Sequence, residues 1–159
     1  MLILGIDPGY AIVGFGVVRY AAPRFAPVEY GAILTEPSQS FGERLDTIYR
    51  RTCEVIERRK PDVMAIERLY YTSNAKTVIM VAEARGVILL AAQHHDLPIR
   101  EYTPLQVKKA VTGHGQALKS QVEEMTRRML CLPQVPKPDD TADALAIAIC
   151  HAHHRQVNR

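Results

Sequence analysis

The segment L-I-L-G-I-D-P-G-Y, residues 2–10, is the part of the sequence on which the fold prediction rests. Its apolar run ends in Asp7 and is followed at once by a Pro-Gly turn, which is typical of a short strand that stops at a polar loop. The segment D-V-M-A-I-E, residues 62–67, repeats this pattern and ends in Glu67. Because a helical segment separates the two, we expect them to be parallel strands of one sheet.

The rest of the chain alternates predicted strands and helices. Runs rich in β-branched and aromatic residues cover 13–20 and extend from about 24 to 35, on either side of a proline-containing turn. An amphipathic helix is predicted over about 40–59, a second helix over about 74–94 and a short strand over 97–102. The order βββαβαβ, followed by further helices, predicts an α/β fold with a mixed sheet and helices on its faces.

Capping patterns predict where the last three helices begin. In T-P-L-Q, Thr103 is the expected N-cap and Gln106 closes a capping box. In S-Q-V-E, we assign the same roles to Ser120 and Glu123. The final helix begins near P-D-D, where Asp139 is the expected N-cap.

The composition is that of an ordinary globular protein. The chain has 159 residues, of which 47% are hydrophobic and 23% charged, and we expect residues 1–159 to form a single domain. The net charge of +3 is compatible with nucleic acid but does not show that the protein binds it. The three cysteines, Cys53, Cys131 and Cys150, form no C-x-x-C pair, and we expect reduced thiols in a cytoplasmic protein.

No segment is expected to enter a membrane. The N-terminal apolar run is too short for a signal peptide and has no basic leader. The longest apolar stretch, 75–92, is interrupted by Lys76, Glu83 and Arg85.

Four acidic residues form the candidate active site. Asp7 and Glu67 end two strands that we expect to be neighbours, whereas Asp140 and Asp143 are three residues apart on one helix face. Bringing these like charges together is costly unless cations neutralise them. Carboxylate oxygens suit Mg²⁺ or Mn²⁺, and two such ions about 4 Å apart could support phosphodiester hydrolysis.

Each acid also has a purely structural alternative. Asp7 precedes Pro-Gly and could serve only as a turn former, and Glu67 could be a solvated residue at a strand end. An Asp at a helix start is often a cap, and Asp139 is the rival to Asp140 for the catalytic position. The four together, in this order of elements, favour the catalytic interpretation.

The chain resembles the RuvC family of Holliday junction resolvases, which are crossover junction endodeoxyribonucleases of the RNase-H-like superfamily. The resemblance runs nearly from end to end and rests on five motifs: I-L-G-I-D-P-G, A-I-E, Q-V-K-K, G-x-G followed by K-S-Q-V, and D-x-x-D-A-L-A-I-A. The first and last are shared by the wider superfamily, but the ordered set with K-S-Q-V is specific to this family.

This resemblance implies an RNase-H-like fold with a five-stranded sheet in which one strand is antiparallel. It also implies a homodimer that cuts two opposed strands of four-way junction DNA with Mg²⁺ or Mn²⁺, leaving ligatable nicks with 5′-phosphates, beside a RuvA/RuvB-type branch-migration complex. The acids Asp7, Glu67, Asp140 and Asp143 match the catalytic and metal-binding positions of the family. Some relatives carry His at the position of Asp140, so its chemical type is the least constrained.

The predicted DNA contacts follow the strand that ends at Glu67 and surround the K-S-Q-V motif. Tyr70 matches a family aromatic that stacks on or wedges against bases, with a packed loop tyrosine as the alternative. Lys119 and Ser120 stand at the expected start of a helix, where phosphate binds readily. Lys108 matches a family lysine in the same neighbourhood, and solvated surface lysines are the alternative.

The helix over about 74–94 is apolar nearly all round, so one face can cover the sheet while the rest needs a second partner. Ala82 and Gly86 would allow close helix approach, which favours a two-fold dimer here. Burial under the C-terminal helices is the alternative. The run of His151, His153 and His154 after Cys150 suggests zinc, but a frayed polar helix end fits better because no second ligand pair has zinc spacing.

Three other functions compete with the junction nuclease. A phosphotransferase of the actin and sugar-kinase superfamily also begins with a strand, an Asp and a Gly, but it needs two such domains. A catalytically silent binder of branched DNA would not need all four acids. A YqgF-like nuclease acting on RNA shares the early and late Asp but is not expected to carry K-S-Q-V.

Overall fold

The computed structural model describes residues 1–69 and 75–157. The elements follow the predicted order βββαβαβααα. The strands are β1 (Leu2–Asp7), β2 (Ile12–Ala21), β3 (Arg24–Leu34), β4 (Val63–Glu67) and β5 (Ile99–Tyr102). The helices are α1 (Phe41–Arg59), α2 (Ala75–His94), α3 (Pro104–Thr112), α4 (Lys119–Met129) and α5 (Asp139–Val157).

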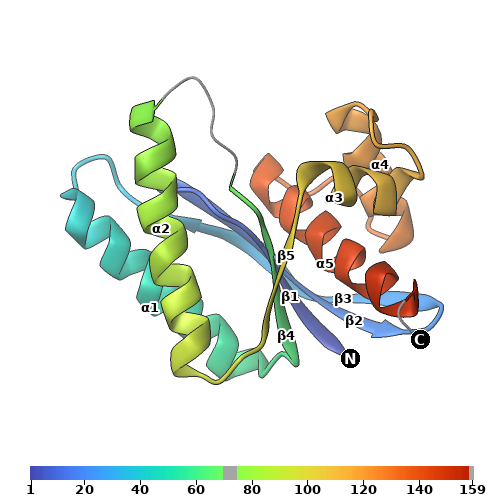
Figure 1. Cartoon of the computed structure of the whole chain (residues 1–159), viewed down its shortest axis with the longest axis horizontal. Helices are drawn as coiled ribbons and strands as arrows, with labels where there is room; N and C mark the ends of the chain where they lie inside the picture. Colours follow the sequence, from blue (N-terminus) through green and yellow to red (C-terminus); the bar gives the residue numbers. More distant parts are fainter. Residues whose placement is uncertain (70–74, 158–159) are drawn as a thin grey trace.

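The five strands form one mixed sheet in the order β3-β2-β1-β4-β5. β2 is antiparallel to both of its neighbours, whereas β1, β4 and β5 pair in parallel. The predicted sheet with a single antiparallel strand is therefore confirmed. Helices α1 and α2 cover one face of this sheet, and α3, α4 and α5 lie on the other (Figure 1).

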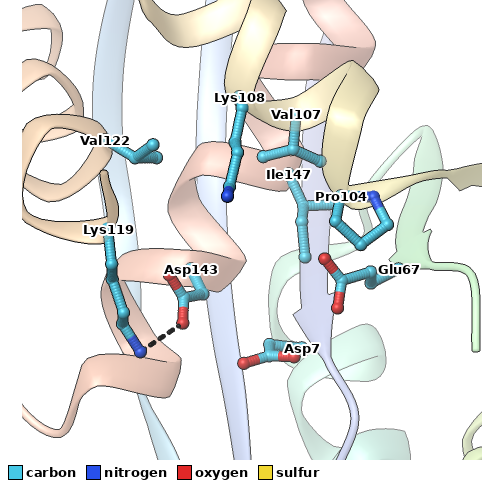
Figure 2. Close-up of a pocket in the computed structure, with 9 residues that line it drawn as sticks. All are labelled: Asp7, Glu67, Pro104, Val107, Lys108, Lys119, Val122, Asp143 and Ile147. Atoms are coloured by element: carbon cyan, nitrogen blue, oxygen red, sulfur yellow. Dashed lines mark ion pairs between the residues drawn. The ribbon is translucent and has the colours of Figure 1, made fainter. Parts of the chain in front are cut away.

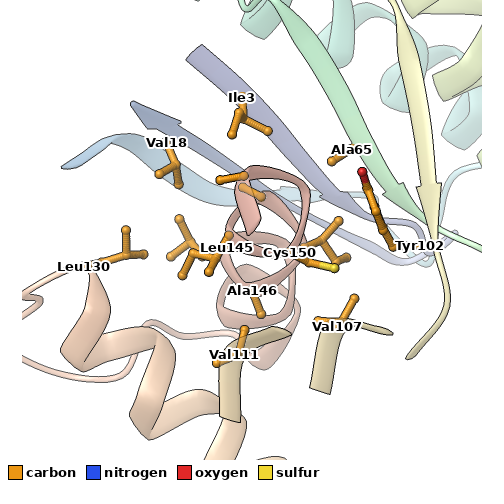
Figure 3. Close-up of a cluster of buried hydrophobic side chains, with 14 of the residues drawn as sticks. Ile3, Val18, Ala65, Tyr102, Val107, Val111, Leu130, Leu145, Ala146 and Cys150 are labelled. Carbon is orange, nitrogen blue, oxygen red and sulfur yellow. The ribbon is translucent and has the colours of Figure 1, made fainter. Parts of the chain in front are cut away.

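Side chains of β1 alternate between two buried clusters. Ile3 belongs to the cluster around α5, whereas Leu4 and Ile6 pack with α1 and α2. Because alternate side chains of a strand share a face, Asp7 lies on the α5 face. β4 follows the same alternation, which places Glu67 on that face too. Figure 3 shows the cluster around α5.

Glycines in the sheet let α5 lie unusually close to it. A Cβ atom built on Gly5 would lie 2.0 Å from the carbonyl oxygen of Ala144, and one on Gly14 would lie 1.8 Å from that of Asp140. No larger residue fits at either position without moving the helix. Nothing in the sequence distinguishes these glycines from other strand residues, yet Gly5 sets the distance between α5 and β1, and Gly14 that between α5 and β2.

The predicted capping box of α3 is confirmed. The amide of Gln106 donates to the Thr103 hydroxyl at 3.1 Å, and the Gln106 side chain accepts from the Thr103 amide at 2.8 Å.

The predicted cap of α4 is wrong. This helix begins at Lys119, and the residue before it, Leu118, donates its amide to the Gln121 side chain at 2.8 Å. Ser120 therefore lies inside the first turn. Gln121 satisfies the free backbone donor in place of the predicted Glu123, because the helix starts earlier than the S-Q-V-E pattern suggested. Similarly, Asp139 is the first residue of α5 and not the residue before it.

The predicted frayed end of α5 is also wrong. The helix continues to Val157, and its histidines make internal contacts. His151 is buried and shares a 2.7 Å hydrogen bond with the Tyr102 hydroxyl, while His153 donates to the carbonyl of Ala110 at 2.9 Å. These side chains join α5 to β5 and α3.

Helix α2 has one buried and one exposed side. By length and composition alone, its segment Thr77–His94 could cross a membrane, although the charged residues within the stretch predicted otherwise. Ala84 and Ile88, however, are fully buried and pack with residues of the sheet, so this face of the helix is part of the core. On the opposite side Ile79 is 59% exposed and Leu90 is 46% exposed. This side lacks a partner among the described residues.

Candidate active site

Two carboxylates lie side by side at one edge of the sheet. Ile6 of β1 pairs with Ile66 of β4 in parallel register, and Asp7 and Glu67 are the next residues of the two strands. Both lie on the α5 face at the strand ends, where the ladder stops and side chains are free to meet (Figure 2).

A third carboxylate reaches the same place from α5. Asp143 lines a cavity of about 240 Å³ together with Asp7 and Glu67. The other lining residues are Pro104, Val107, Lys108, Lys119, Val122 and Ile147. Asp140 does not line this cavity, but its main chain rests on Gly14 and its charge acts on Asp7. The structure therefore gathers three of the four predicted acids closely, with the fourth beside them.

The carboxylates strongly influence one another. Burial, and then the charges of Glu67, Asp143 and Asp140, raise the pKa of Asp7 to about 8. Burial is also the main cause that raises the pKa of Glu67 and of Asp143. With this pKa, Asp7 holds its proton at neutral pH unless a cation replaces it.

Lys119 supplies part of the missing positive charge. Its Nζ atom lies 3.1 Å from Asp143 and 3.4 Å from Asp139. Burial lowers the pKa of Lys119, but the hydrogen bond and charge of Asp143 and the charge of Asp139 outweigh it and raise the pKa overall. Lys108 lines the same cavity and acts on Glu67, whose pKa it lowers against the larger effect of burial.

The donor set suits a hard divalent cation. Carboxylate oxygens from three elements converge there, and the charges of Glu67, Asp143 and Asp140 add to burial in raising the pKa of Asp7. In the described part of the chain, no three His, Cys, Asp or Glu side chains are arranged so that they could hold a metal ion without first moving. Asp143 is paired with Lys119 instead, so a cation would have to compete with that ammonium group.

One predicted DNA contact, Ser120, does not line this cavity. Ser120 opens onto a separate pocket, which it shares with His114 and Arg128, because consecutive residues at a helix start point in different directions. Tyr70, and the weaker candidate Tyr71, lie outside the described residues.

Two apolar residues of the site were not predicted from the sequence. Val107 and Ile147 line the cavity between the charged groups. Helical spacing could have identified them, since Val107 adjoins Lys108 and Ile147 follows Asp143 by one turn.

A family model described as crossover junction endodeoxyribonuclease RuvC matches residues 3–151. The chain belongs to the RuvC family. A RuvC from Pelotomaculum thermopropionicum is 53% identical over 154 residues, covering 97% of this chain and 94% of the relative. A RuvC from Clostridioides difficile is 46% identical over 159 residues, covering 100% of this chain and 94% of the relative. RuvC family proteins are metal-dependent nucleases, so the predicted enzyme class is confirmed.

Solved structures agree with this assignment. The RuvC of T. thermophilus in complex with a Holliday junction substrate superposes with a TM-score of 0.95 at 36% identity, covering 99% of this chain and 96% of that one. The yeast mitochondrial resolvase Ydc2 has the same fold, with a TM-score of 0.67 at 14% identity over 98% of this chain and 83% of that one. The RNase-H-like fold predicted from the motifs is thereby confirmed.

Proposed function

We propose that this RuvC chain resolves Holliday junctions by making paired, metal-dependent nicks in opposed strands near the crossover. The observation that carries the proposal is the cavity itself. It holds Asp7, Glu67 and Asp143 opposite two lysines, in a chain that matches the RuvC family over residues 3–151. Acids that collect cations and lysines that attract phosphate are what phosphodiester cleavage requires.

The metal ligands are Asp7, Glu67, Asp140 and Asp143, and the ions are two Mg²⁺ or Mn²⁺. Bound there, such ions would activate water and stabilise the leaving oxygen. Asp7 and Glu67 come from strands and are rigidly placed, so they fix the position of the scissile phosphate relative to the sheet. Asp143 is the adaptable ligand, because it must first exchange its contact with Lys119.

The two lysines bind the DNA backbone at the cavity. Lys108 comes from α3 and Lys119 from the first residue of α4, so the two approach the acids from separate elements. Lys119, which pairs with Asp143 here, would be able to contact a backbone phosphate if a cation held that carboxylate. Ser120 binds the backbone further along α4, and Tyr70 stacks on a base beside the crossover.

Two opposed cuts require two active sites, and we place the dimer interface on α2. Ile79, Ala82, Gly86 and Leu90 are exposed and recur at helical spacing on one side of this helix. Small residues between larger apolar ones permit close helix packing. An apolar stripe of this kind is costly to leave in water, and a second copy of the chain would cover it.

The cellular setting follows from the substrate. A junction resolvase works on chromosomal DNA, so we place the chain in the cytoplasm, together with a RuvA/RuvB-type branch-migration complex.

The experiment that tests this function compares substrates. A synthetic four-way junction, a linear duplex of the same sequence and an RNA–DNA hybrid are incubated with Mg²⁺, Mn²⁺ or EDTA. We expect cutting of the junction alone, with either metal. Equal cutting of junction and duplex would rule out a resolvase, preferential cutting of the hybrid would favour a YqgF-like nuclease, and junction binding without cutting would indicate a silent binder.

A further inference from the structure

An arginine of α2 contacts the main chain of Glu67. The Nε atom of Arg85 donates a hydrogen bond to the Glu67 carbonyl oxygen at 3.4 Å, and its Nη2 forms an ion pair with Glu101 of β5. The Arg85 side chain is only 15% exposed. A guanidinium that is largely shielded from water holds its partners more firmly than a surface charge does.

Glu101 also forms an ion pair with Arg68, the residue that follows Glu67. Arg68 Nε lies 3.4 Å from Glu101, and the Arg68 amide donates to the Tyr102 carbonyl at 2.8 Å. The hydrogen bond from Arg85 is the main cause that lowers the pKa of Glu101, so this carboxylate is ionised at neutral pH. The end of β4 is thus fixed to β5 and to α2 at once.

This arrangement matters because Glu67 is the last residue of its strand. The regular ladder of β4 ends there, and the glutamate side chain must still point toward Asp7. Glu67 lines the cavity beside Asp7 and Asp143, so any shift of the end of β4 would move its carboxylate relative to both. A displacement of about 1 Å at such a residue is enough to impair a metal site.

We propose that Arg85, paired with Glu101, is a positioning residue that holds the carboxylate of Glu67 in place for metal binding. Arg85 does not line the cavity and acts only through the main chain of Glu67. The inference rests on the proposed function in one respect, which is that Glu67 is a metal ligand. Because Arg85 belongs to α2, it also joins the proposed dimer helix directly to the active site.

A purely structural brace between α2 and the sheet would explain the same contacts. The two interpretations differ in metal affinity, since a brace affects folding, whereas a positioning residue affects the site of the folded protein. Residues that orient metal ligands typically change metal affinity about 10- to 100-fold when they are replaced. Titration of Mn²⁺ into the DNA-free full chain by calorimetry, beside thermal unfolding in EDTA, therefore separates them.

The variants are Arg85→Gln, Arg85→Lys and Glu101→Gln, with Glu67→Gln as the reference and Arg100→Gln as the control. Arg100 is an exposed arginine of β5 that donates a hydrogen bond to the carbonyl of its own neighbour, Ile99. We expect Arg85→Gln to weaken Mn²⁺ binding about 10-fold or more. Arg85→Lys should recover part of the loss, because lysine keeps the charge but not the planar fork. Arg100→Gln should bind as the parent does.

Arg85→Gln that melts earlier but binds Mn²⁺ as tightly as the parent would overturn the proposal. If Arg85→Gln fails to fold, Arg85→Lys and Glu101→Gln carry the same test. Glu67→Gln separates the assignment of Glu67 as a metal ligand from the positioning role of Arg85. If Glu67→Gln leaves Mn²⁺ binding unchanged, Glu67 is not a metal ligand and the positioning role of Arg85 is ruled out as well. If Glu67→Gln weakens Mn²⁺ binding but the Arg85 variants do not, only the positioning role of Arg85 is ruled out.

Discussion

Gly14 of β2 lies in direct main-chain contact with Asp140 of α5. A Cβ atom on Gly14 would stand 1.8 Å from the Asp140 carbonyl oxygen, far inside any permitted contact. This contact sets the height of α5 above the sheet and, one turn further along the helix, brings Asp143 over Asp7. The position of Asp143 over Asp7 therefore depends on residue 14 having no side chain.

Replacing Gly14 by Ala should move the start of α5 away from the sheet. We expect a loss of about 1–3 kcal/mol in the free energy of unfolding, as for other overpacked cores, and a loss of cleavage larger than stability alone explains. Denaturant unfolding and a junction cleavage assay measure the two effects. Gly42 of α1 is the matched control, since a Cβ there meets nothing within 4 Å. Unchanged cleavage by Gly14→Ala would show that the close approach is dispensable.

The raised pKa of Asp7 makes stability depend on pH. With a pKa of about 8, the folded protein without metal keeps a proton that the unfolded chain gives up above about pH 4. The free energy of unfolding should therefore fall as pH rises between these values. In EDTA, Asp7→Asn should melt above the parent at pH 8, with a difference that shrinks toward pH 4. A constant difference across this range would contradict the assigned pKa.

Lys119 and a divalent cation should compete for Asp143. The Lys119 ammonium lies 3.1 Å from that carboxylate. Lys119→Met therefore removes the group that competes with the metal for Asp143, and it leaves more negative charge on the acids uncompensated. We expect tighter Mn²⁺ binding by calorimetry together with slower junction cleavage, since the phosphate contact is also lost. Weaker Mn²⁺ binding by this variant would mean that Lys119 supports the metal site and does not compete with it.

The exposed side of α2 should determine the oligomeric state. Leu90→Glu places a charge on the proposed interface, so we expect the parent to be a dimer and the variant a monomer by light scattering at micromolar concentration. Leu34 of β3 is 60% exposed and lies on another surface, so Leu34→Glu serves as the control. A monomeric parent, or a Leu90→Glu variant that still dimerises, would place the interface elsewhere.

The parts of the fold that depend on local pattern could be predicted from the sequence. The alternation of apolar runs gave the order of strands and helices, and the ends of β1 and β4 placed Asp7 beside Glu67. The capping box at Thr103 was recognised because both of its members have distinctive side chains. At α4 the same logic chose Ser120, although Gln121 was the residue that satisfied the helix start.

What could not be predicted depends on contacts between distant segments. The close approach of α5 to the sheet depends on glycines of the strands. In the sequence these glycines look like ordinary strand residues, because the helix that packs on them is distant along the chain. The pairing of Lys119 with Asp143 and the link from Arg85 to Glu67 join elements whose distance no spacing rule gives. The histidines of α5 were misjudged for the same reason, since their partners Tyr102 and Ala110 are remote in sequence.

The most direct test of the catalytic assignment is cleavage of a synthetic four-way junction by the parent, Asp7→Asn and Asp139→Asn. Asp139 is the neighbouring acid that pairs with Lys137 at 2.7 Å and does not line the cavity. We predict that Asp7→Asn binds the junction but does not cut it with Mg²⁺ or Mn²⁺, while Asp139→Asn still cuts. Cutting by Asp7→Asn, together with its loss in Asp139→Asn, would contradict the assignment of the acids.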